Sequence, residues 1–246
     1  MTDIVSFVKS LELAEGRGYR AVLTELGLPP GNKQQGYVND GSLVSFTSNL
    51  EGLQKQDVLH SSLLAQLAAN KKHDRLEDSK NWYMFYTNVM ATVGWDIQSF
   101  QFDEYDSTSS TVKVSQVTLK LLSSILGGDE EMMEVIKNTI DKLAKDSQGA
   151  SLLQSSSSSQ NHGNFQVVPC NVDKSNQVNV AFLGCFFRAS EVAKDYFFFD
   201  YKKEDIHLFK GTQVFTLDQQ IYGKVREAVI EKLGDNANTK IHDLHI

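Results

Sequence analysis

Apolar residues recur at intervals of three and four positions along the first part of the chain, a spacing that predicts amphipathic helices. Two short helices are expected first, over residues 3–13, with Asp3 as the N-cap, and over residues 19–26, ended by Gly27. Longer apolar stripes predict further helices over residues 58–68, 82–93, 114–125 and 132–143. Partial alternation of apolar and polar residues predicts short strands over residues 43–48 and 95–102.

The second part of the chain has the pattern of a strand-rich region. Apolar runs separated by polar turns predict an antiparallel meander over residues 165–170, 178–188, 195–201 and 206–215, the last interrupted at Gly211. The serine-rich stretch at residues 154–163 predicts a mobile loop before the meander. A closing helix is expected from Leu217, with Thr216 and Gln219 as a capping box and Gly234 as its end.

These elements predict an α+β fold: a mainly antiparallel sheet packed with helices, helix-rich in its first half and strand-rich in its second. The length of 246 residues fits one domain, so residues 1–246 are expected to form a single α+β unit. The runs at residues 180–187 and 196–199 lack the alternation of a strand with one wet face. Both faces of these strands therefore need a cover.

Two interpretations of those apolar runs remain open. They form either the middle of a sheet between helices, or a pocket or lipid-facing surface. The candidate pocket residues are Phe182, Leu183, Phe186, Phe187, Phe197, Phe198 and Phe199.

Charge and targeting signals narrow the class of partner. The net charge of −7 and the absence of a dense basic stripe argue against nucleic-acid binding. The basic cluster at residues 71–75 is interrupted by Asp74 and is typical of a solvated helix surface. We expect a soluble chain made in the cytoplasm without a signal peptide, since no secretory signal and no long apolar stretch are present. Release or membrane association by another route stays open.

Catalytic and metal-binding motifs are absent from the sequence. His242 and His245 lie three positions apart, but no cysteine or acid at ligand spacing accompanies them, so no metal site is expected. Cys170 with His162 is the nearest approach to a thiol hydrolase. We therefore expect no catalytic residue and no dissociable cofactor. Cys170 and Cys185 are expected as free buried thiols, although a disulfide between neighbouring strands is geometrically possible.

Several segments with aromatic residues and glycines resemble a bacterial family, that of the Erwinia virulence factor Evf. They are Asn81-Trp82-Tyr83, Val93-Gly94-Trp95, Gly163-Asn164-Phe165-Gln166, Leu183-Gly184-Cys185-Phe186, Tyr222-Gly223-Lys224-Val225-Arg226 and Lys232-Leu233-Gly234. The resemblance covers most of the chain from about residue 80 onward.

This resemblance implies an α/β or α+β fold and a non-enzymatic, virulence-associated or toxin-like role with a lipid or membrane as partner. It also implies a fatty acid, such as palmitate, held on a cysteine as a thioester and enclosed by the protein. Cys185 fits best because its neighbours are apolar, and Cys170 is the alternate. A buried sixteen-carbon chain contributes on the order of 11–12 kcal/mol of apolar transfer. The alternatives are a soluble protein that binds a lipid or small apolar ligand without acylation and, third, a cysteine-dependent hydrolase.

Overall fold

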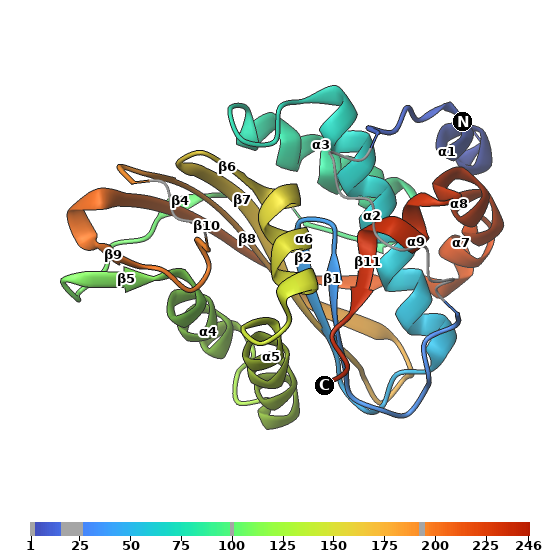
Figure 1. Cartoon of the computed structure of the whole chain (residues 1–246). Helices are drawn as coiled ribbons and strands as arrows, with labels where there is room; N and C mark the ends of the chain where they lie inside the picture. The colour runs from blue at the N-terminus through green and yellow to red at the C-terminus, as the bar shows by residue number, and fades with distance from the viewer. Residues whose placement is uncertain (1–2, 16–26, 99–100, 192–194) are drawn as a thin grey trace.

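A long mixed sheet runs through the molecule, and helices cover both of its faces (Figure 1). The computed structural model describes residues 3–15, 27–98, 101–191 and 195–246. In spatial order the strands of the main path are β11 (Ile241–Asp243), β1 (Gln35–Asn39), β2 (Ser42–Phe46), β7 (His162–Val172), β8 (Val178–Ala189), β10 (Ile206–Leu217) and β3 (Trp95–Asp96). All neighbours on this path are antiparallel except β2 and β7, which are parallel.

Four short strands complete the described sheets. β4 (Asp103–Glu104) pairs with β10, and β6 (Ser158–Ser159) pairs with the start of β7. β5 (Thr111–Lys113) and β9 (Asp200–Lys202) form a separate two-stranded sheet, with the 3-10 turn Lys203–Asp205 after β9.

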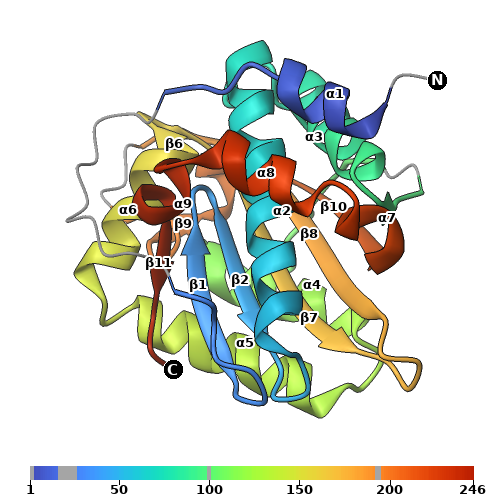
Figure 2. The same cartoon turned by 90° about the vertical axis from the view of Figure 1, so that its right-hand side faces the viewer.

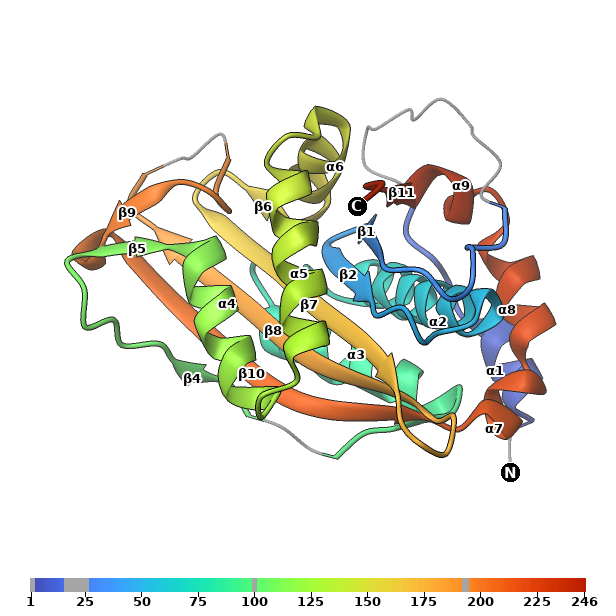
Figure 3. The same cartoon turned by 90° about the horizontal axis from the view of Figure 1, so that it is seen from below.

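The helices divide between the two faces of the main sheet. Figure 2 shows α2 (Gly52–Lys72) crossing one face, with α3 (Ser79–Thr92), α8 (Arg226–Leu233), α1 (Ile4–Ser10) and α7 (Gln219–Gly223) beside it. Figure 3 shows α4 (Val114–Ile125), α5 (Glu130–Leu143) and α6 (Ser147–Ser157) on the opposite face. The short α9 (Asn236–Lys240) leads into β11. The predicted α+β fold, mainly antiparallel and packed with helices, is confirmed.

Each face of the sheet has its own apolar core. Phe182 and Phe215 belong to the core under α2 and α3, whereas Leu183, Cys185 and Phe187 belong to the core under α4 and α5. Because successive strand residues point to opposite faces, an unbroken apolar run is what a strand covered on both sides requires. The expectation that both faces of the 180–187 run are covered is confirmed.

The helices with clear apolar stripes form as predicted. Asp3 caps α1 by accepting from the Val5 N–H at 3.4 Å, and Asp129 caps α5 by accepting from Met132 N–H at 3.0 Å. Gly127, with a positive φ of 58°, lies between α4 and α5, as its ease in the left-handed region allows. The helix expected over residues 19–26 lies outside the described residues.

The serine-rich stretch is not a loop: α6 continues to Ser157 and β6 follows it. The hydroxyls of Ser157 and Ser158 donate to the carbonyl oxygens four residues earlier, at 2.5 and 2.8 Å. These bonds satisfy the hydroxyls inside the helix. Leu152 and Leu153 are buried and pack this polar helix against the sheet. The serine-rich composition of the segment indicated neither these hydroxyl hydrogen bonds nor the packing of the two leucines.

Two strand predictions are also corrected. Residues 195–198 form a turn, and β9 begins only at Asp200 and pairs with β5, so it is not part of the meander. Of the strand expected over residues 95–102, Trp95–Asp96 is the part that pairs with β10. β10 itself continues through Gly211 without interruption, and β1 is a strand that the sequence pattern did not predict.

The N-cap of the closing helix is Asp218 and not the predicted Thr216. Thr216 belongs to β10, where its hydroxyl donates to the Asn179 amide oxygen at 2.8 Å. Asp218 caps α7 instead, accepting from the N–H groups of Gln220 and Ile221. The helix is also divided into α7 and α8, and Gly234 ends α8 as expected. Among the described residues, no helix is both long and apolar enough to cross a membrane.

Gly36→Ala tests the packing of α5 on β1. A Cβ at Gly36 would lie 2.6 Å from Thr139 Oγ1, so we expect a loss of about 1–3 kcal/mol in the free energy of unfolding by urea. Gly223→Ala is the control, because the nearest atom to its Cβ is 3.9 Å away. Equal stability of Gly36→Ala and the wild type would contradict this packing.

A second prediction concerns acid sensitivity. Burial within α2 lowers the pKa of His60 from 6.5 to about 4. The unfolded chain therefore binds the proton first, and stability present above pH 6.5 is lost as the pH falls toward 4, by up to about 3 kcal/mol. His60→Leu should remove this part of the pH dependence, measured by urea unfolding between pH 4 and 7. Parallel profiles of the two proteins would exclude His60 as its source.

Candidate functional site

Cys185 lies in the middle of β8, the strand with a long partner on each side. It pairs with Phe165 of β7 and Lys210 of β10. Its side chain is 1% exposed and belongs to the core under α4 and α5. Burial raises the pKa of the Cys185 thiol well above its usual value, and the charge of Lys210 opposes that rise. The thiol is therefore protonated and out of contact with solvent in this conformation.

Aromatic rings from three separate segments surround this part of the core. Phe165 of β7 lies 5.5 Å from Phe197 and 5.6 Å from Tyr196, centroid to centroid. Phe187 of β8 lies 5.2 Å from Tyr196. Tyr196 and Phe197 come from the turn before β9, so a short non-helical segment closes the apolar group that contains Cys185.

Few hydrogen bonds hold that aromatic turn in place. The Tyr196 hydroxyl pairs with Ser157 Oγ at 2.8 Å, and the Tyr196 N–H donates to the Gln154 side chain at 3.3 Å. The Ser115 N–H donates to the Phe197 carbonyl at 2.9 Å. Contacts with α6 and the start of α4 thus position the two rings over the sheet.

Cys170 lies on β7 but on the other face of the sheet, in the core under α2. Its side chain is completely buried, and burial raises the pKa of its thiol. His162 lies at the start of the same extended strand, eight residues and roughly 26 Å away at the rise of a strand. Cys170 and His162 therefore do not form the pair that a thiol hydrolase needs. Both cysteines are free, and the sheet separates them.

The sheet also separates the predicted pocket residues. Leu183, Phe187 and Phe197 belong to the core around Cys185, and Phe198 packs against it. Phe182 and Phe186 point to the opposite face, where Phe182 stacks on Phe215 at 4.7 Å and Phe186 stacks on Phe209 at 4.8 Å. Phe199 is 39% exposed and contacts Tyr201.

A pocket of about 440 Å³ lies against the stacked pair of Phe186 and Phe209. Lys80, Arg188 and His207 line its polar side together with Glu77 and Asp78, and Arg188 pairs with Glu77 at 3.4 Å. Neither cysteine lines it, since Cys185 points to the other face of β8. This pocket is an apolar surface with charged side chains of both signs at its edge, as an amphipathic ligand requires.

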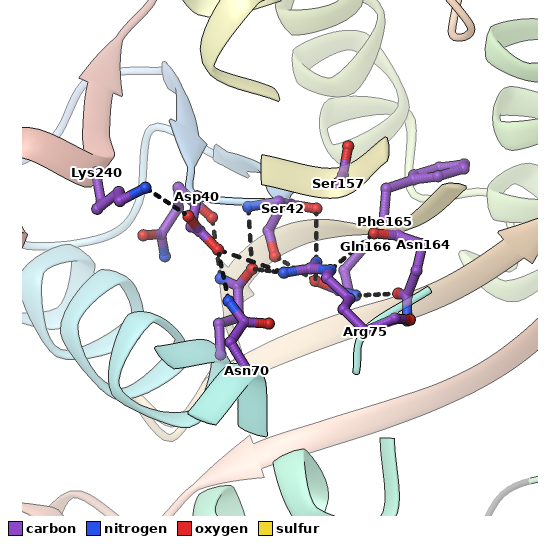
Figure 4. Close-up of polar contacts among 12 residues, drawn as sticks. Asp40, Ser42, Asn70, Arg75, Ser157, Asn164, Phe165, Gln166 and Lys240 are labelled. Carbon is purple, nitrogen blue, oxygen red and sulfur yellow. Dashed lines mark hydrogen bonds and ion pairs between the residues drawn. The ribbon is translucent and has the colours of Figure 1, made fainter. Parts of the chain in front are cut away.

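A buried polar cluster surrounds Arg75, as Figure 4 shows. The guanidinium donates to the carbonyl oxygens of Asn164 at 2.9 Å and Gly41 at 3.2 Å. It also donates to the amide oxygens of Gln166 at 2.8 Å and Gln66 at 3.2 Å, and it pairs with the Asp40 carboxylate at 3.3 Å. Burial lowers the Arg75 pKa and the charge of Asp40 opposes the change.

The solvated-surface interpretation of residues 71–75 is wrong for Arg75, which is 6% exposed and lies 4.4 Å from the Trp82 ring. No local signal in the sequence reveals this cluster, because its partners come from distant segments. Lys240, from the end of α9, contacts the same carboxylate of Asp40 at 3.4 Å and is also buried.

The C-terminal histidines each have a single acidic partner. His242 lies 3.0 Å from Asp146, and His245 lies 3.4 Å from Asp243. In the part of the chain that the structure describes, no three histidine, cysteine, aspartate or glutamate side chains gather as they would around a metal ion.

Comparison with known proteins gives distant likenesses to solved structures alone. No protein-family model matches the chain, and no curated protein matches it. Among solved structures, the Evf virulence factor is similar to it over 97% of this chain and 90% of that chain, with 16% identity and a TM-score of 0.38. An overlap with this score carries no conclusion about function, so the family named from the sequence segments remains a resemblance.

Burial predicts that both thiols of the unmodified chain react slowly. We expect labelling by a disulfide reagent at pH 8 to be at least about 100-fold slower in the native protein than in urea, since only the exposed thiolate attacks. The absorbance of the released reagent measures the rate. Rapid labelling of one thiol per native chain would contradict the burial of the cysteines.

Proposed function

We propose that this protein carries a long-chain fatty acid as a thioester on Cys185 and interacts with membranes. The observation that supports this proposal is the position of the thiol: it lies in an apolar core under α4 and α5 that the short aromatic turn with Tyr196 and Phe197 completes. The virulence-associated role rests on the sequence resemblance alone.

The free energies of burial favour an enclosed acyl chain over the closed turn. Displacing Tyr196 and Phe197 breaks three hydrogen bonds and exposes two rings, a loss of roughly 8 kcal/mol. Burial of a sixteen-carbon chain contributes on the order of 11–12 kcal/mol in return. The acyl chain would therefore replace the two rings against Phe165 and Phe187.

The attachment step is an exchange of thioesters. With the turn displaced, the Cys185 thiol is solvated and its pKa is released from the rise that burial causes. Its thiolate attacks the carbonyl carbon of an acyl thioester donor, the donor's carbon–sulfur bond breaks, and the departing thiolate takes up a proton. No oxidant or reductant is needed.

A second candidate function is reversible binding of an amphipathic ligand without acylation. The pocket beside Phe186 and Phe209 supports it, because stacked rings face the ligand and Lys80 at the rim can pair with an acid group. Binding there would leave Cys185 unmodified.

Intact mass measurement separates the two functions. After incubation with palmitoyl-coenzyme A, we expect the wild type and Cys170→Ala to gain the mass of one palmitoyl group, which hydroxylamine removes. Cys185→Ala should gain nothing. An unmodified wild type with two thiols titratable in urea would exclude the thioester, and saturable palmitate binding by that protein, lost in Phe186→Ala, would support the second function.

A further inference from the structure

A small pocket of about 70 Å³ lies at the end of the β1–β2 hairpin, where α2, α6 and α9 meet. Asp40, Arg75 and Lys240 line one side, and Ser156 and Ser158 of the α6 region line another. It is distinct from the surroundings of Cys185, because none of its lining residues belongs to that aromatic group.

Among the side chains that the structure describes, the buried charges beside this pocket do not balance. Arg75 and Lys240 carry two positive charges, and their side chains are 6% and 5% exposed. Asp40, 3% exposed, supplies one negative charge, and Glu15 at the pocket is exposed to solvent. A buried charge without a counterion is costly, so this pocket has a net positive charge of one to be compensated.

Of the two buried cations, Lys240 has the N–H groups that are available to a ligand. The five N–H groups of Arg75 all point at protein acceptors, as the contacts in Figure 4 show. Among the described residues, the Lys240 ammonium has Asp40 as its partner, at 3.4 Å, although it can donate three hydrogen bonds.

The hydroxyl of Ser156 provides a further donor on the side of α6. The Ser156 hydroxyl oxygen is buried and has no hydrogen-bond partner in the described part of the chain. An orphan hydroxyl of this kind is satisfied by water or by a ligand. Ser156 and Lys240 both line the same small pocket.

We propose that this pocket binds a small oxyanion, the carboxylate or phosphate group of a small molecule or the free ion. Lys240 supplies the charge and donated hydrogen bonds, and Ser156 donates from the α6 side. The volume admits one such group and excludes a bulky ligand. A metal cation does not suit the site, since two buried cations line it and the carboxylate of Asp40 is already shared between them.

Titration calorimetry with inorganic phosphate and, separately, with acetate at constant ionic strength tests this site. We expect saturable binding of one equivalent of at least one anion, and a thermal midpoint that rises with its concentration. Lys240→Gln should weaken binding at least tenfold, and Ser156→Ala several-fold. Phosphate binding alone would identify a phosphoryl ligand, and acetate binding alone a carboxylate.

Two variants serve as matched controls. Lys72→Gln removes an exposed cation at the end of α2, and Ser151→Ala removes an exposed hydroxyl of α6; both should keep wild-type affinity. Ser156→Ala keeps the test valid if Lys240→Gln does not fold, because it changes no charge. Absence of saturable binding by both anions, or equal weakening in Lys72→Gln and Lys240→Gln, would overturn the proposal and leave water as the occupant.

Discussion

The buried guanidinium of Arg75 joins three segments that are distant from one another in sequence. Its hydrogen bonds reach the turn between β1 and β2, the side chain of Gln66 on α2 and two residues of β7. A charge removed from water is tolerated because every donor has an acceptor and Asp40 supplies a counter-charge. The cluster therefore fixes the positions of the β1–β2 hairpin and α2 relative to β7. The pocket beside Lys240 and the core around Cys185 both depend on this arrangement.

The spacing of apolar residues predicted the elements whose buried residues recur with a regular period. It did not predict the residues that are buried by contacts with distant segments. The apolar stripes of α4 and α5 and the unbroken apolar run of β8 predicted these elements, and the apolar neighbours of Cys185 predicted its burial. Arg75 was not predictable, because its contact with Gln166 joins residues 91 positions apart. The separate pairing of β9 with β5 depends equally on a partner that no nearby residue indicates.

The sheet separates two chemical environments. Around Cys185, the face under α4 and α5 is nearly all apolar, which suits a hydrocarbon chain. The face under α2 contains buried Lys55, Asp57 and Gln66, each held by hydrogen bonds, and the Arg75 cluster lies at its end. The two candidate sites thus differ in the ligand that each can stabilise, and binding at one requires no contact with the other.

The parallel pairing of β2 with β7 has a consequence for how the chain folds during synthesis. β1, β2 and α2 are made early, yet β2 gains its second neighbour only with residues 166–170, and β1 only with residues 241–243. Pairings between distant segments form slowly, and unpaired strand edges expose the chain to aggregation meanwhile. The edge of β2 therefore stays open until the ribosome has released β7, and the edge of β1 stays open until β11 is made, so this hairpin is exposed to aggregation for most of synthesis.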